Sequence, residues 1–115
     1  LKPVTPRIMG RIVFLTDERA ISYAESVIGY VADRKLGTIV GGTTAGTNGN
    51  VATFVVPTGF IVAFTGMRVT GHDGRTPFHL IGVRPHIPVA PTLAGVRSGR
   101  DEVLERAVAV IRGTK

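Results

Sequence analysis

The order of apolar and polar residues in the first third of the chain predicts an alternation of strand and helix. Residues 11–16 are dominated by β-branched and aromatic side chains without polar alternation, which predicts a buried strand. From Ser22 onward apolar residues recur every three or four positions, which predicts a helix with one buried face and with Gly37 as its C-terminal cap. Residues 38–40 form a second short apolar run. Strand, helix and strand in this order predict a parallel β-α-β unit and an α/β fold.

The rest of the chain predicts a loop, a hairpin and a final helix. Residues 41–50 are rich in glycine and threonine and predict a loop. Residues 51–56 and 60–69 are β-rich and are separated by Pro-Thr-Gly, as expected of a β-hairpin. After an extended, proline-containing stretch, we expect Ser98 to cap a helix over residues 101–112.

Composition and charge exclude several classes of protein. The 115 residues, 43% hydrophobic and 19% charged, fit a single globular domain. No apolar run approaches the ~20 residues of a membrane span, and the absence of cysteine excludes disulfides and thiolate sites. The formal net charge is +6, but the basic residues are scattered and only 6% of residues are aromatic, so we expect no nucleic-acid partner.

Ser22 allows two interpretations. A hydroxyl at the start of a helix that follows a strand and a polar loop is one way to hold a nucleophile beside free backbone N–H groups. Ser22 and Glu25 also have the Ser-x-x-Glu spacing of a capping box, in which each side chain satisfies an amide of the first helical turn. The spacing alone leaves both interpretations open.

The glycine-rich loop does not support nucleotide hydrolysis. Gly41 and Gly46 have the spacing of a phosphate-binding loop, but Thr47 stands where that loop requires lysine.

Three histidines recur at seven-residue intervals, at His72, His79 and His86. Such spacing aligns side chains only on a helix, which the prolines and glycine between them prevent, so we expect no metal site. His79 is the candidate proton carrier, with a structural histidine as the alternative. No residue pattern indicates a cofactor.

The joint order of these motifs resembles the C-terminal half of the tail-specific (C-terminal processing) serine peptidases, which include the tricorn core and the interphotoreceptor retinoid-binding protein. The motifs are Ser22-Tyr23-Ala24-Glu25, Thr38 to Gly46, the hairpin, Asp73-Gly74-Arg75-x-Pro77, Gly82-Val83-Arg84-Pro85 and the last helix. The resemblance implies a Clp/crotonase-like fold of strand-strand-helix units. Residues 1–115 would be a single domain, the C-terminal part of a catalytic domain whose upstream half is missing.

The resemblance also implies a serine endopeptidase mechanism. Ser22 would be the nucleophile and the Tyr23 N–H an oxyanion donor, with His79 as a second catalytic candidate. The loop at Gly46 and Thr47 is expected to contact substrate. Thr47 occupies the lysine position of the serine–lysine branch. In the tricorn-like branch an upstream histidine is the base, supported by an acid before Gly-Val-x-Pro.

This chain has no carboxylate in that acid-bearing stretch, and His86 follows the proline. We therefore expect the isolated chain to be inactive and to require the upstream part of the polypeptide. The resemblance implies a peptide or protein substrate, an extracytoplasmic location and a possible homo-oligomer. The alternative is a non-catalytic ligand- or peptide-binding module on the same fold.

Overall fold

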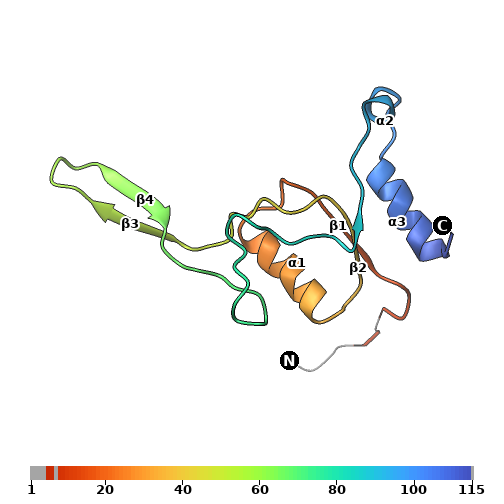
Figure 1. The fold of residues 1–115 in the computed structure, drawn as a ribbon, viewed down its shortest axis with the longest axis horizontal. Helices are drawn as coiled ribbons and strands as arrows, with labels where there is room; N and C mark the ends of the chain where they lie inside the picture. The colour runs from red at the N-terminus through yellow and green to blue at the C-terminus, as the bar shows by residue number, and fades with distance from the viewer. Residues whose placement is uncertain (1–4, 7, 115) are drawn as a thin grey trace.

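The computed structural model describes residues 5–6 and 8–114, which form a small α/β core with two projections (Figure 1). The elements in chain order are β1 (Val13–Thr16), α1 (Tyr23–Asp33), β2 (Thr38–Gly41), β3 (Val51–Val55), β4 (Ile61–Thr65), β5 (Ile87–Pro88), α2 (Leu93–Arg97) and α3 (Glu102–Arg112). The hairpin of β3 and β4 projects from one side of the core, and α2 and α3 lie on the other. The predicted α/β class is confirmed.

The core is a parallel sheet with strand order β1-β2-β5. β1 pairs with β2 in register from Val13 opposite Thr38 to Thr16 opposite Gly41, and α1 connects them, which confirms the predicted β-α-β unit. Ile39 of β2 is fully buried in an apolar cluster with Ile28 and Val31 of α1. Val40 is equally buried. Because side chains alternate along a strand, Val40 points to the opposite face, which α3 covers (Figure 1).

The end of α1 differs from the prediction that Gly37 caps it. Lys35 takes the left-handed conformation, with φ 52°. The Lys35 N–H donates to Ala32 O and the Leu36 N–H to Val31 O, which is the Schellman pattern. Gly37 lies beyond this motif, in a place where a Cβ would come within 2.6 Å of Ile12 O. Gly37 is therefore explained by the close approach of Ile12 and of the Phe14 side chain in β1.

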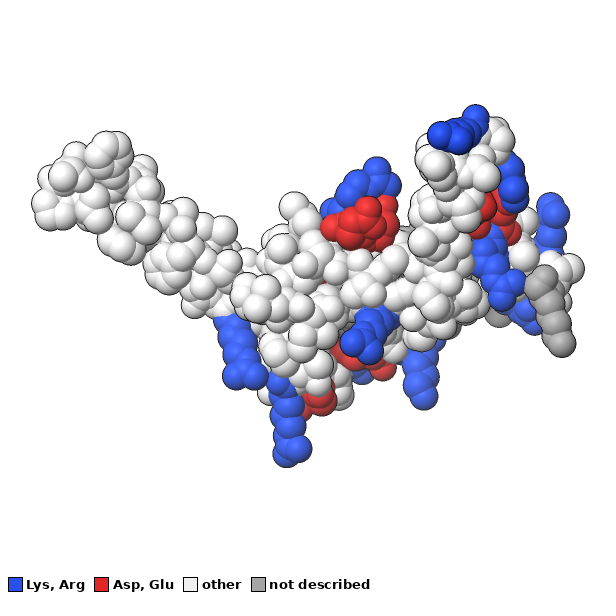
Figure 2. All heavy atoms as spheres, turned by 45° about the horizontal axis from the view of Figure 1, so that its top comes forward, with Lys and Arg blue, Asp and Glu red and all other residues white. Residues whose placement is uncertain are grey.

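The predicted hairpin is confirmed, and it is exposed on both faces. β3 and β4 pair antiparallel from Val51 opposite Thr65 to Val55 opposite Ile61. No residue between 36 and 67 is charged, and Figure 2 shows the projecting hairpin free of acidic and basic side chains. The radius of gyration is 17.9 Å, whereas a compact domain of this length would have about 13 Å. A two-stranded ribbon is at best marginally stable alone.

The C-terminal region contains one helix that the sequence analysis missed and one that it predicted. Thr92 caps α2 by accepting from the Gly95 N–H. The prediction that Ser98 caps the last helix is wrong, because the Asp101 carboxylate accepts from the Leu104 N–H. The Ser98 hydroxyl instead donates to Ala94 O at the end of α2. Among the described residues, no helix has the length and apolar character to cross a membrane.

The predicted turn at Gly71–Gly74 closes through a hydrogen bond from the Gly74 N–H to Gly71 O and carries a perturbed carboxyl group. The Thr76 hydroxyl, followed by the Arg75 and Thr76 N–H groups, lowers the pKa of Asp73 from 3.8 to about 2. Because these donors favour the charged form, the carboxylate stabilises the folded turn above about pH 4.

We expect that stabilisation to disappear as the pH falls from about 4 to about 2, the interval between the unfolded and folded pKa values of Asp73. A carboxyl-detected NMR titration of Asp73 should show the low pKa in the folded protein. Thr76→Val should raise it, since the hydroxyl is its largest cause. A pKa near 3.8 in the folded unsubstituted protein would contradict the expectation.

Candidate active site

Ser22 occupies a strained turn between β1 and α1. Its backbone has φ 52° and ψ −118°, and the Ala24 N–H donates to Ile21 O at 3.1 Å. These are the angles of the first central residue of a type II′ turn, a position that glycine dominates. A serine at this position costs about 1–3 kcal/mol in backbone strain. Strain of this kind between a strand and a helix is typical of nucleophile elbows, which hold the hydroxyl out from the fold.

The Ser22 hydroxyl and the amide that follows it have no partner among the described residues. Ser22 is exposed and stands at the N-cap position of α1, but its side chain makes no capping hydrogen bond. The capping box is therefore not formed. The Tyr23 N–H donates to no acceptor in the part of the chain that the structure describes. An unpaired N–H at the positive end of a helix favours an anion beside Ser22.

Glu25, the expected partner in the capping box, points away from Ser22 and binds the glycine-rich loop. Its side chain is fully buried. One carboxylate oxygen accepts from the Thr44 hydroxyl at 2.6 Å and from the Gly46 N–H at 2.7 Å. The other accepts from the Thr47 N–H at 2.8 Å and from its hydroxyl at 3.4 Å. A sequence signal for this contact existed, because Glu25 shares a helix face with the buried Ile28 and Gly29.

The structure places Gly46 and Thr47 in this loop beside α1. Because Glu25 binds both of their N–H groups, those amides are not free to bind a ligand. Gly46 O accepts from the Leu80 N–H at 2.7 Å, which joins the loop to the segment that contains His79. The Thr47 residue remains exposed.

His79 is exposed on this segment, and within residues 5–6 and 8–114 its imidazole makes no hydrogen bond with Ser22. The other two histidines are engaged elsewhere. His86 Nδ1 accepts from the Ile39 N–H at 2.9 Å, and the backbone N–H of His72 donates to the Asp33 carboxylate. In the described part of the chain, no group of three histidine or acidic side chains could hold a metal ion.

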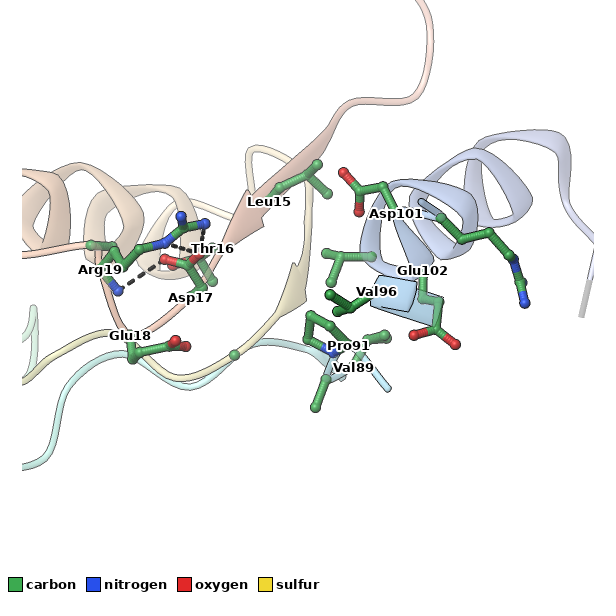
Figure 3. A pocket seen from close by; sticks show the side chains of 15 residues that line it. Leu15, Thr16, Asp17, Glu18, Arg19, Val89, Pro91, Val96, Asp101 and Glu102 are labelled. Carbon is green, nitrogen blue, oxygen red and sulfur yellow. Dashed lines mark hydrogen bonds and ion pairs between the residues drawn. The ribbon is translucent and has the colours of Figure 1, made fainter. Parts of the chain in front are cut away.

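A pocket of about 1010 Å³ opens next to the segment that leads into Ser22 (Figure 3). It lies at the carboxyl ends of the strands, where α/β sheets commonly bind ligands. Leu15, Val89 and Val96 contribute apolar surface. At one side Arg19 bonds to Asp17, and this side-chain hydrogen bond lowers the pKa of Asp17. Ser22 itself does not line the pocket.

Comparison with known proteins identifies the class. The model of peptidase family S41 matches residues 2–89. The chain therefore belongs to peptidase family S41. The predicted resemblance to the tail-specific and tricorn-like serine peptidases is confirmed at the level of this family. No curated protein sequence matches the chain.

Solved structures of peptidases share the fold. A putative peptidase from Parabacteroides merdae has a TM-score of 0.81 and 24% identity, over 96% of this chain and 35% of its own. Mature CPAF complexed with lactacystin has a TM-score of 0.75 and 28% identity, over 90% of this chain and 21% of its own. The tricorn protease has a TM-score of 0.78 and 21% identity, over 90% of this chain and 10% of its own. The chain thus spans about a third or less of these proteins.

Proposed function

We propose that this chain carries the nucleophile of a serine endopeptidase, with Ser22 as the nucleophile. The observation that carries the proposal is the strained turn that presents an unpartnered Ser22 hydroxyl beside the unpaired Tyr23 N–H. In a serine that only capped α1, the hydroxyl oxygen would accept a hydrogen bond from an N–H of the first helical turn. Such a cap would not need a left-handed backbone. The membership of family S41 supports the same conclusion.

In the proposed reaction, Ser22 Oγ attacks the carbonyl carbon of a peptide bond and loses its proton to a base. The carbonyl oxygen becomes an oxyanion, which the Tyr23 N–H stabilises. One such donor contributes about 3 kcal/mol. Collapse of the intermediate releases the amine, which takes up a proton, and leaves an ester on Ser22. Water then hydrolyses the ester and regenerates the serine.

Two histidines are candidates for the base. His79 is the candidate within this chain, on a segment tied to the Gly46 carbonyl through Leu80. The resemblance to the tricorn-like branch offers an upstream histidine instead. We propose that the exposed Thr47 side chain lines the path of the peptide substrate beside Ser22.

Labelling of the full polypeptide with a fluorophosphonate tests the proposal. We expect a single adduct, which mass spectrometry should locate on Ser22, and no adduct in Ser22→Ala. Ser98→Ala is the matched control, because Ser98 is also at a helix end but donates to Ala94 O. A folded protein that never reacts at Ser22 would overturn the proposal.

The alternative is a non-catalytic peptide-binding module on the same fold. It is favoured by the lack of a base bonded to Ser22 among the described residues and by Thr47 at the lysine position of the serine–lysine branch. This alternative requires peptide affinity without labelling or cleavage. Equal peptide binding by the unsubstituted protein and by Ser22→Ala, with neither of them cleaving, would support it.

A further inference from the structure

The loop of residues 44–47 forms hydrogen bonds with the chain on both sides of the strained turn, and Glu25 makes those on one side. The Ala45 N–H donates to Ala20 O at 3.0 Å, immediately before the turn. Immediately after it, the Glu25 carboxylate accepts from Thr44, Gly46 and Thr47. One loop therefore fixes the chain at both ends of the segment from Ile21 to Ala24. A strained backbone conformation persists only where contacts with the surrounding structure hold it in place, as these hydrogen bonds do.

The loop is itself anchored in the fold. The Thr44 hydroxyl donates to Glu25 and accepts from the Val83 N–H at 2.7 Å. The Thr44 N–H donates to Val83 O, and a Cβ on Gly82 would lie 2.4 Å from Thr44 O. The loop and segment 80–83 are thus closely packed, and the carboxylate binds a loop that is itself held by the fold.

We propose that Glu25 is a positioning residue that holds Ser22 in its reactive, strained conformation through the loop of residues 44–47. This inference rests on the proposed function for its consequence in catalysis. The carboxylate suits the task because all four groups that it meets are N–H or O–H donors, and a carboxylate only accepts. It also leaves the amides near Ser22 free, which a capping Glu25 would not.

Glu25→Gln is the direct test, since glutamine keeps the size but turns one acceptor into a donor. Either orientation of the amide places an N–H group against the Gly46 or the Thr47 N–H. We expect kcat and the rate of fluorophosphonate labelling to fall by about 100-fold, the effect of a small misplacement of the nucleophile. Glu25 is buried and holds Thr47, so any rise in KM that comes through Thr47 should be smaller than the fall in kcat. A folded variant with unchanged rates would overturn the inference.

Thr44 supplies a second pair of variants in case Glu25→Gln does not fold. Thr44→Ser keeps the hydroxyl that bonds to Glu25 and should retain the labelling rate. Thr44→Val keeps the shape and removes the hydroxyl, and it should lose rate in the same way as Glu25→Gln. Equal rates for the two folded Thr44 variants would contradict the role of the carboxylate contact.

A thermal-unfolding cycle separates this inference from the proposed function. Ser22→Gly should raise the melting temperature, because glycine relieves the strain. In the Glu25→Gln background the rise should be much smaller, because the released turn has already relaxed. Additive shifts in melting temperature would overturn the inference whether or not Ser22 reacts. If the melting-temperature shifts are non-additive but Ser22 is never labelled, the positioning role of Glu25 stands and only the peptidase proposal is rejected.

Discussion

Ser22→Gly should abolish peptide hydrolysis by the full polypeptide while making the protein more stable. Loss of a serine nucleophile lowers kcat on the order of a millionfold. Glycine adopts φ 52° without the cost that serine bears. After allowance for the greater freedom of glycine in the unfolded chain, the free energy of unfolding should rise by about 1 kcal/mol. Peptide cleavage assays and chemical denaturation measure the two effects.

Ser22→Ala is the matched control for this prediction. Alanine removes the hydroxyl but keeps the Cβ and hence the strain, so activity should be lost with little gain in stability. If the alanine and glycine variants were equally stable, the left-handed backbone of Ser22 would not be strained. If either retained hydrolysis, Ser22 would not be the nucleophile.

Gly41→Ala should cause the largest loss of stability of any single methyl group added to the sheet. Gly41 ends β2 with φ 127°, and a Cβ there would lie within about 2.0 Å of Thr16 O on the paired strand. The φ angle and the Thr16 carbonyl are both features of the backbone, so neither can be relieved by rotating a side chain. We expect the free energy of unfolding to fall by about 3–5 kcal/mol, measurable by denaturant titration.

Gly42→Ala provides the comparison, one residue further along. Its Cβ would meet Asp17 Cα at 3.3 Å, and Gly42 does not have a left-handed φ. We expect a loss below about 1 kcal/mol. Similar losses for the two variants would show that the close approach of β2 to Thr16 does not control the stability of the sheet.

The parts of the fold that follow from local pattern could be predicted from the sequence. The β-α-β unit, the hairpin and the last helix each have a continuous periodicity or a turn signal in a few neighbouring residues. The ends of the helices were less predictable. Lys35 adopts a conformation that usually selects glycine, and Asp101, three residues after Ser98, caps the last helix.

The position of Ser22 could be predicted from the sequence, and the contacts that support it could not. A hydroxyl at the start of a helix makes Ser22 a candidate nucleophile, and the family resemblance adds the Tyr23 N–H as a candidate donor. The backbone angles of Ser22 could not be predicted, because a left-handed serine leaves no mark in the sequence. Glu25 fits a capping box as well as a buried contact, and only the position of residues 44–47 in space decides between them. Long-range contacts of this kind are determined by the fold as a whole.

The absence of charge on the hairpin has a consequence for any surface that would pack against it. A surface that packs on Phe54, Phe64 and Ile61 strips water from hydrocarbon and removes no ion from its hydration shell. Attachment there should therefore be almost indifferent to ionic strength and should weaken on cooling. If the edges of this hairpin remain exposed, they would tend to pair with the hairpin of a second copy of the chain.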